Sequence, residues 1–473
     1  MKKFPLVLSL VFLVICFQES AGQEVITIQQ AIEKTLTNNL QIKQSQLNES
    51  LSDENLRQSK NALLPTLNGN GGYNVNFGRS EDPSTRQFNT QKFSSFNGGI
   101  STGVDIFQGF QKMNQIRQNK LLLDVDKTTT EKVKNDLILQ VVTSYLQILY
   151  NKDFLTAAQQ QLAVAKQQLT REEELLEVGN KTLADLSQAK SQVATAELNT
   201  TNATNDLAIS YLTLAQLMDV PSSTIYSVSA PVLESFNKPD TNANPQEVYD
   251  AAIKLFPDIK LAALQTEASK IGINIAKGNY YPTLSFGAGL NTTYSSGRDR
   301  VLNVVPNGFR EIGRTEGGEP VLTPDFTTLT DIYRFNDQLR DNFGQYVGVS
   351  LRIPIFNGFA ARSTVRRARI NYLQNQTQEQ LALNNLNKVI YQAVADLKAA
   401  DSRFTSTTNT FQAQKDAFNV IEQRYAVGLA NSLDYSTSQT NLNRAEIDMI
   451  QAKYDLLFRA KLIDYYLGKQ IVF

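Results

Sequence analysis

The same sequence pattern occurs twice in this chain of 473 residues. Leu64–Leu67 (Leu-Pro-Thr-Leu) matches Tyr281–Leu284 (Tyr-Pro-Thr-Leu) at an offset of 217 residues, and Ile106–Phe110 matches Ile355–Phe359 at an offset of 249. The two offsets differ by 32 residues, which indicates an insertion in the second copy. A fixed internal period usually means that one copy cannot cover its own apolar surface. We therefore predict one architecture built from two structural repeats, residues 23–236 and 237–473.

Each repeat contains a long stretch without proline or glycine, residues 111–177 and 360–426. As a helix, each stretch of ~67 residues would extend about 100 Å. Apolar residues recur every seven positions in the second stretch, as in one line of a coiled-coil seam: Phe404, Phe411, Phe418 and Tyr425. Both stretches end at Val-Gly, where glycine is typical of a left-handed C-cap. A returning helix follows each end, near 183–218 and 432–467.

These patterns predict a helical hairpin in each repeat, at about 109–219 and 359–468. A shorter helix precedes each hairpin, near 27–60 and 245–277. Between the shorter helix and the hairpin, the apolar period changes from helical to two, which is typical of strands. Four strands are predicted, at about 64–78, 94–107, 281–297 and 342–356. We expect the loops that join them, roughly 79–92 and 298–341, to be polar and irregular.

The four strands permit two interpretations, because each is apolar on one face and small or polar on the other. They could be half-buried hairpins on a soluble sheet, or strands of a lipid-facing barrel, in which apolar and polar residues alternate in the same way. Four strands cannot close a barrel, since small barrels need about eight. If the strands form a barrel, three copies of the chain would supply twelve of them.

The N-terminus has the pattern of a secretory signal at residues 1–22. Lys2 and Lys3 precede an apolar run from Leu6 to Phe17, and Ser20-Ala21-Gly22 supplies small residues for cleavage. Leu13-Val14-Ile15-Cys16 begins like a lipobox, although Ile15 is bulky where a small residue is wanted, so lipidation of Cys16 remains an alternative. The chain is therefore predicted to be exported.

Composition argues against most enzymes. The chain has no histidine, and Cys16 is its only cysteine, so neither the usual hydrolase base nor a common zinc site can form. Gly99–Gly103 spells G-x-S-x-G, but that motif needs a histidine partner. Basic and acidic residues balance at 46 each, so the chain has no net positive charge that would attract nucleic acid. We predict no catalytic residue, cofactor, metal site or nucleic-acid partner.

The order and duplication of these pieces resemble the TolC-type outer-membrane efflux protein family over nearly the whole mature chain. The specific pieces are the Pro-Thr-Leu entry to each strand pair, Ile353–Phe359 at the strand-to-helix junction, and Val-Gly at both hairpin tips. The resemblance implies a homotrimer with a twelve-stranded membrane β-barrel in outer-membrane lipid and an α-helical periplasmic tunnel. It also implies a periplasmic adaptor (membrane fusion) protein and an inner-membrane pump as partners, with export of drugs, toxic solutes or proteins.

The resemblance also implies roles for single residues. The hairpin tips are candidates for adaptor contact: Val178, Gly179, Asn180, Val427, Gly428 and Leu429. Asp434 matches an inward-facing aspartate of the family gate, while Thr437 stands where the family has a second one. Tyr425 and Asp185 match residues that hold the tip closed. A basic partner of that contact is expected to be missing, because Ala430 occupies its position.

For both aspartates, a simpler interpretation is a first-turn carboxylate that favours the helix N-terminus. Two other classes of protein also remain open. An exported, non-conducting coiled-coil scaffold or adhesin would explain the helices without the paired strands. A carboxylate-based cell-wall hydrolase would need two acidic residues that converge in a cleft.

Overall fold

The computed structural model describes residues 24–81, 88–89, 92–221, 226–229 and 243–469. The predicted signal peptide, including Cys16, lies outside these residues, as does the predicted boundary near residue 236. The described residues divide into two compact units. We call them the helical unit (through Ser52, Leu122–Thr266 and from Gln374 onward) and the sheet unit (Asp53–Leu121 and Glu267–Leu373).

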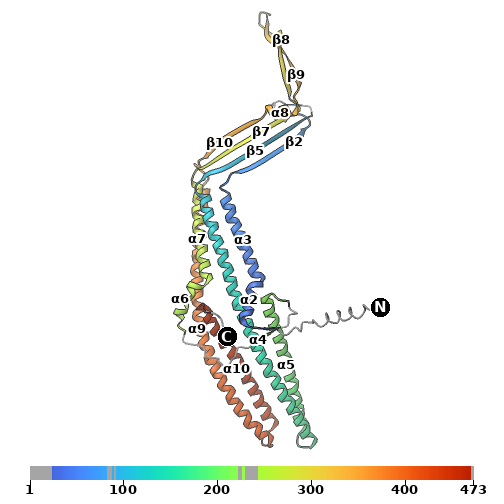
Figure 1. The fold of residues 1–473 in the computed structure, drawn as a ribbon, viewed down its shortest axis with the longest axis vertical. Coiled ribbons are helices and arrows are strands. Elements are labelled where there is room, and N and C mark those ends of the chain that lie inside the picture. The colour runs from blue at the N-terminus through green and yellow to red at the C-terminus, as the bar shows by residue number, and fades with distance from the viewer. Residues whose placement is uncertain (1–23, 82–87, 90–91, 222–225, 230–242, 470–473) are drawn as a thin grey trace, which may run out of the picture. The chain divides into compact units, whose positions relative to one another are not determined.

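Long helices and antiparallel strands account for most of the described chain (Figure 1). The α-helices are α2 (Ile28–Asn38), α3 (Leu40–Asn61), α4 (Gln111–Glu177), α5 (Leu183–Met218), α6 (Pro245–Leu255), α7 (Pro257–Lys277), α8 (Phe335–Asp341), α9 (Ala360–Ala426) and α10 (Ser432–Tyr466). The strands are β1 (Glu24–Ile26), β2 (Thr66–Asn76), β3 (Ser80–Glu81), β4 (Phe88–Asn89), β5 (Phe93–Gln108), β6 (Tyr226–Val228), β7 (Thr283–Ser295), β8 (Asp299–Arg314), β9 (Pro320–Ile332) and β10 (Gly344–Arg352). Across these described ranges, no helix combines the length and the apolar character that crossing a bilayer requires.

The sheet unit contains one four-stranded antiparallel sheet with the order β10-β7-β5-β2. Its register separates the residues by face, because cross-strand partners share a face. One face is largely apolar: Leu67, Tyr73, Val75, Phe96, Ile100, Val104, Leu284, Phe286, Leu290, Tyr294, Val347, Val349 and Leu351. The opposite face carries Asn, Ser, Gly and a few other polar residues: Asn70, Asn74, Asn97, Ser101, Asp105, Ser285, Asn291, Ser350 and Arg352. Gly99–Gly103 lies within β5, so the G-x-S-x-G sequence forms no strand-to-helix elbow.

The expectation of an irregular loop at residues 298–341 is wrong. This segment forms the antiparallel hairpin β8–β9, followed by the short helix α8. Its β-branched and aromatic residues favour strands, and Gly318, with φ at 86°, lies in the turn between them. Register shifts, such as the one between Pro306 and Gly308, interrupt the alternation along β8.

The predicted helices 27–60 and 245–277 each prove to be two consecutive helices. In the first repeat, Asn39 has an extended backbone, and its Oδ1 accepts a hydrogen bond of 2.8 Å from the backbone N–H of Gln41. In the second repeat, Phe256 precedes Pro257, and a residue before proline is disfavoured in the helical region. The interruption is thus present in both copies but has a different local cause in each.

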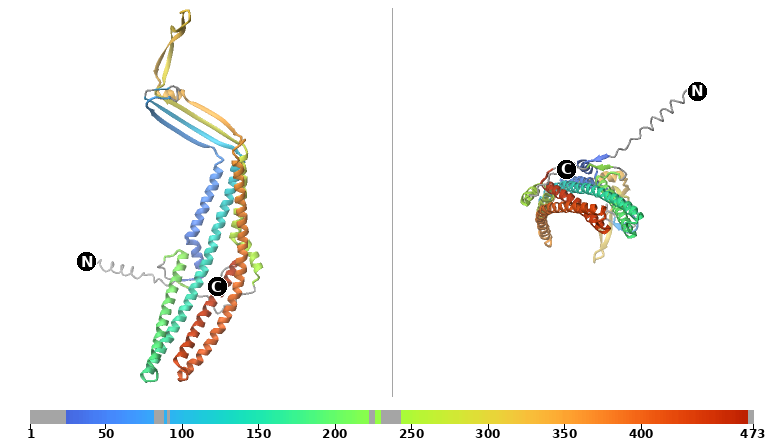
Figure 2. Two further views of the ribbon diagram at one scale, coloured as in Figure 1. Left: turned by 180° about the vertical axis from the view of Figure 1, so that it is seen from behind. Right: turned by 90° about the horizontal axis from the view of Figure 1, so that it is seen from below.

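The helical unit is organised around two antiparallel helical hairpins, α4–α5 and α9–α10, whose lower parts lie side by side (Figure 2). One apolar core joins α4, α5 and α10 to the two short parallel strands β1 and β6. The Tyr145 hydroxyl lies in this core and donates to the backbone oxygens of Ile26, at 3.1 Å, and Ser229, at 2.7 Å. A second core joins α6, α9 and α10 around Ile390, Leu397 and Leu456.

The junction between strand and long helix has the same unusual backbone in both repeats. Gly109 and Phe110 have φ values of 58° and 63°, and Gly358 and Phe359 have values of 61° and 62°. The surroundings of the two glycines differ. A Cβ on Gly109 would lie 2.5 Å from the backbone oxygen of Gly278, whereas a Cβ on Gly358 would meet no atom within 4 Å.

We expect Gly109→Ala to lower the free energy of unfolding by about 1–3 kcal/mol more than Gly358→Ala, because only the first adds a steric clash. Both substitutions carry the same left-handed backbone cost, so the difference isolates the clash. Denaturant unfolding of the purified protein in detergent, followed by circular dichroism, measures it. Equal losses of stability in the two variants would contradict this account.

Candidate functional site at the hairpin tips

The two hairpin tips have matching backbone geometry. Gly179 and Gly428 have φ values of 77° and 76°. The N–H of the residue after each glycine donates to a carbonyl in the last helical turn, from Asn180 to Leu175 at 2.8 Å and from Leu429 to Arg424 at 2.8 Å. The predicted left-handed glycine caps are therefore confirmed.

The tips present apolar side chains to solvent. Val178 is 67% exposed, and Val427 and Leu429 are each 70% exposed. Leu183 and Leu433, in the first turns of the returning helices, are 70% and 69% exposed. These side chains form an uncovered apolar surface at the end of each hairpin in the isolated chain, since each lies at or beside a turn.

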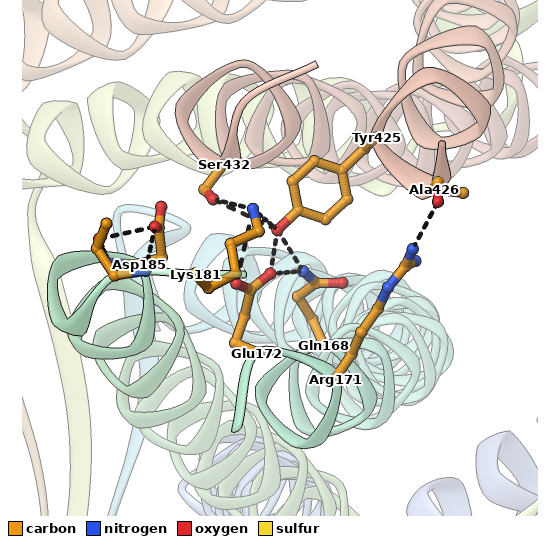
Figure 3. Close-up of polar contacts among 9 residues, drawn as sticks. Gln168, Arg171, Glu172, Lys181, Asp185, Tyr425, Ala426 and Ser432 are labelled. Atoms are coloured by element: carbon orange, nitrogen blue, oxygen red, sulfur yellow. Dashed lines mark hydrogen bonds and ion pairs between the residues drawn. The ribbon is translucent and has the colours of Figure 1, made fainter. Parts of the chain in front are cut away.

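A polar cluster joins the two hairpins just behind the tips (Figure 3). Its centre is the hydroxyl of Tyr425, at the end of α9, which donates to Glu172 Oε1 on α4. The same hydroxyl oxygen accepts hydrogen bonds from Gln168 Nε2 at 3.1 Å and from Lys181 Nζ at 2.9 Å. Three polar side chains of the first hairpin thus converge on one tyrosine of the second. We call these four residues the tip lock.

Glu172 is the most deeply buried member of the tip lock, with only 2% of its surface exposed. Its Oε1 accepts from Tyr425 and from Gln168 Nε2, and its Oε2 lies 3.8 Å from Lys181 Nζ. A buried carboxylate needs such partners, because an uncompensated buried charge is strongly destabilising. The Lys181 ammonium also donates to Ser432 Oγ at 2.9 Å, which adds a contact to α10.

Two cations lie close to the Tyr425 ring. Lys181 Nζ lies 4.4 Å and Arg171 Cζ lies 5.5 Å from the ring centre. Arg171 also donates to the backbone oxygen of Ala426 at 3.2 Å. Cation–π contacts of this kind contribute about 0.5–2 kcal/mol, depending on how far they are desolvated.

The expected absence of a basic partner for Tyr425 is wrong. Ala430 does occupy the position two residues after Gly428, but Lys181 occupies the matching position after Gly179 in the first repeat. Lys181 reaches across to Tyr425 from the neighbouring hairpin. The 249-residue offset between the copies could have indicated this, because it aligns Lys181 with Ala430.

Asp185 takes part in a capping box at the start of α5. Its side chain accepts from the Thr182 backbone N–H at 3.1 Å and from the Thr182 hydroxyl at 2.7 Å, and its own N–H donates to Thr182 Oγ1. Hydrogen bonds from the Ser432 hydroxyl and from Thr182 lower the pKa of Asp185 to about 2. This carboxylate therefore stays ionised at neutral pH. Its contribution to the free energy of unfolding is lost only as the pH falls towards the lowered pKa of about 2.

Asp434 lies in the first turn of α10 and is exposed. Its backbone N–H donates to the Asn431 side chain at 2.7 Å, which caps the helix. Thr437, one turn further along, is exposed as well. Of these two positions on α10, only Asp434 therefore carries a carboxylate, and Asp434 is not a member of the tip lock.

Aromatic packing supports the tip lock from behind. Tyr435 lies 4.8 Å from Tyr425 in a stacked arrangement and 5.4 Å from Phe418, measured between ring centres. Burial, together with the nearby Glu422 carboxylate, raises the pKa of Tyr435 to about 12. Within the ranges that the structure describes, no three acidic or cysteine side chains gather in a way that could hold a metal ion.

Comparison with known proteins places the chain in a family. The family model described as outer membrane efflux protein matches residues 31–219 and 248–469, one segment for each repeat. The chain belongs to the outer membrane efflux protein family. It is thus a TolC-type protein of the Gram-negative outer membrane.

Relatives of this outer membrane efflux protein match it over most of their length. It is 21% identical to the outer membrane efflux protein BepC of Brucella suis, with 92% of this chain and 85% of BepC covered. It is also 21% identical to the outer membrane protein TolC of Escherichia coli, with 93% and 82% covered. Among solved structures, the CmeC outer membrane channel of Campylobacter jejuni matches with a TM-score of 0.74 at 16% identity, covering 93% of this chain and 85% of CmeC. At this identity, the structural likeness is one of fold.

Proposed function

We propose that this outer membrane efflux protein is the exit duct of a multi-component efflux or secretion system, which passively conducts solutes that an inner-membrane pump delivers. The observation that carries the proposal is the two-faced sheet. Its apolar face is extensively exposed, with Val347 at 74% and Val349 at 66%, while Asn, Ser and Gly line the other face. Such a sheet suits lipid on one side and a watery lumen on the other.

The barrel is proposed to form from three copies of the chain. β2 and β10 are the edge strands of the sheet, and four strands are too few to close a barrel. Pairing β10 of one copy with β2 of the next would satisfy both edges and give twelve strands. In this assembly the helical hairpins form a periplasmic tunnel, in agreement with the fold of the channels that the chain resembles.

The hairpin tips are proposed to contact a periplasmic adaptor. The proposed contact residues are Val178, Gly179 and Asn180 in one hairpin and Val427, Gly428 and Leu429 in the other. Val178, Val427 and Leu429 are apolar knobs at the two glycine-capped turns. An adaptor with apolar helical seams could cover these knobs in a coiled-coil-like manner. Their exposure in the isolated chain supports this proposal.

The gate is proposed to combine the tip lock with Asp434 and Asp185. The tip lock, which includes Tyr425, ties one hairpin to the other and so restrains an outward movement of the tips. Asp434 is exposed, and three copies would form a ring of carboxylates that attracts cations. Asp185, fixed in its capping box, stiffens the start of the returning helix.

We expect purified wild-type protein to form small, cation-selective channels in planar bilayers, and Asp434→Asn to reduce that selectivity, because it removes one negative charge per subunit. The measurement is the reversal potential in a salt gradient. A matched control is Asp448→Asn, an exposed carboxylate further along α10. Protein that stays soluble without detergent and never inserts would instead favour the non-conducting scaffold or adhesin.

A further inference from the structure

The β8–β9 hairpin, which we call the ribbon, has two chemically different faces. Its register places six large apolar residues on one face, and between 49% and 79% of each is exposed: Val301, Val304, Phe309, Leu322, Phe326 and Ile332. Asp299, Glu311 and Arg314 lie towards the two ends of that face. The opposite face carries mainly polar residues, with Val305, Val321 and Leu329 among them: Arg300, Asn303, Arg310, Thr323, Asp325, Thr327 and Asp331. Arg310 Nε lies 3.8 Å from Asp325 Oδ1 across this polar face. The ribbon is therefore amphipathic.

The apolar face of the ribbon needs a cover. A two-stranded hairpin alone is at best marginally stable in water, and contiguous exposed apolar surface usually marks a contact site. Lipid is a poor cover for this ribbon. A two-stranded ribbon has two free edges, and their unpaired N–H and C=O groups would be costly in hydrocarbon. A protein surface can cover the apolar side chains while the edges and the polar face stay in water.

The base of the ribbon is fixed beside an edge of the four-stranded sheet. α8 follows β9 and leads directly into the edge strand β10. The fully buried Gln338 of α8 donates to the Ser295 backbone oxygen at 2.8 Å and accepts from the Ser295 N–H at 3.0 Å, so it binds α8 to the end of β7. The ribbon therefore begins next to the edge at which a second copy would join.

We propose that the cover is a second copy of this chain: the ribbons of neighbouring subunits pack apolar face against apolar face outside the barrel. This inference rests on the proposed trimer, since the shared barrel edge is what brings the ribbons of different copies together. The three ribbons then form a protein collar at the outer mouth of the duct. The polar faces, with Arg310 and Asp325, remain in water.

Disulfide crosslinking in the full-length protein tests the contact between ribbons. Val304→Cys introduces a thiol on the apolar face, and Thr327→Cys introduces one on the polar face as a matched control. Cys16, the only native cysteine, lies in the predicted signal peptide, so the wild-type protein reports the background. Outer membranes are oxidised with copper phenanthroline, and subunits are separated by gel electrophoresis without reductant.

We expect about tenfold more crosslinked dimer from Val304→Cys than from Thr327→Cys, because a disulfide forms only between Cβ atoms about 3.5–4.5 Å apart. Adding Phe309→Ser and Phe326→Ser to Val304→Cys should reduce the crosslink, since both rings lie on the same face. Equal crosslinking from the two faces would overturn the proposal.

Two further measurements separate the ways in which the inference can fail. Light scattering of the detergent-purified variants reports the trimer: monomers would contradict the proposed function, whereas trimers without face-specific crosslinks would contradict only the ribbon contact. A bimane label on Val304→Cys, tested in vesicles that contain brominated phosphatidylcholine, reports lipid contact. Quenching at this position but not at Thr327→Cys would assign the apolar face to lipid and overturn the proposal.

Discussion

Replacing Tyr425 with Phe and Lys181 with Ala in the same chain is expected to raise the single-channel conductance several-fold. The double variant removes two donors that face the buried Glu172 and breaks the contact of Lys181 with Ser432. Leaving a buried charge without its partner costs about 3–5 kcal/mol, which corresponds to more than about a hundredfold in the ratio of open to closed tips. Conductance in planar bilayers at neutral pH measures the change.

The matched control for the tip lock is Lys166→Ala. Lys166 forms an ion pair with Glu197 at 3.1 Å, but both residues belong to the first hairpin, so this pair does not join the two hairpins. Its loss should leave the conductance unchanged. A third variant adds Glu172→Leu to the double variant and should restore a low conductance, because it removes the buried charge. An unchanged conductance in the double variant would show that the tip lock does not hold the tips closed.

Replacing Val349 with Arg is expected to prevent assembly in the membrane. Val349 is 66% exposed on the apolar face of β10, and an arginine on the lipid face of a barrel costs about 2–4 kcal/mol near the bilayer midplane. A trimer would bear this cost three times. The amount of heat-modifiable trimer in outer membranes, measured by gel electrophoresis with and without heating, reports assembly.

Ser350→Arg is the matched control, one residue further along the same strand and on the opposite face. That face already carries Arg352, so a guanidinium there is compatible with the sheet. This variant should assemble at the wild-type level and shift ion selectivity away from cations, since it adds positive charge to the lumen. Similar assembly of the two arginine variants would contradict the assignment of faces.

The sequence predicts the long elements well because their signals are long. Sixty-seven residues without proline or glycine, which end at a glycine, leave few alternatives to a single helix, and α4 and α9 have these bounds. The period-two alternation likewise corresponds to β2, β5, β7 and β10. The ribbon was missed because Pro306, Pro320 and Pro324 are typical of loops, and register shifts hide its alternation.

The tip lock was harder to predict because its members lie far apart in the sequence. The family resemblance points to Tyr425, but it predicts the basic partner in the same repeat, at the position that Ala430 occupies. Lys181 lies 244 residues from Tyr425, and which side chain meets the tyrosine depends on how the two hairpins pack. Glu172 occupies a seam position that is usually apolar, and this departure was the one local signal of a buried polar contact.

The tip lock has a consequence for the ancestry of the chain. Under the 249-residue offset, Gln168, Glu172 and Lys181 align with Ala417, Ile421 and Ala430, and Tyr425 aligns with Leu176. Six identical half-length chains could supply the same strands and helices, yet each interface between hairpins would lack either the tyrosine or the groups that hold it. This contact therefore requires two halves that have become different. Joining them in one polypeptide keeps the two kinds of half in equal number and in alternating order.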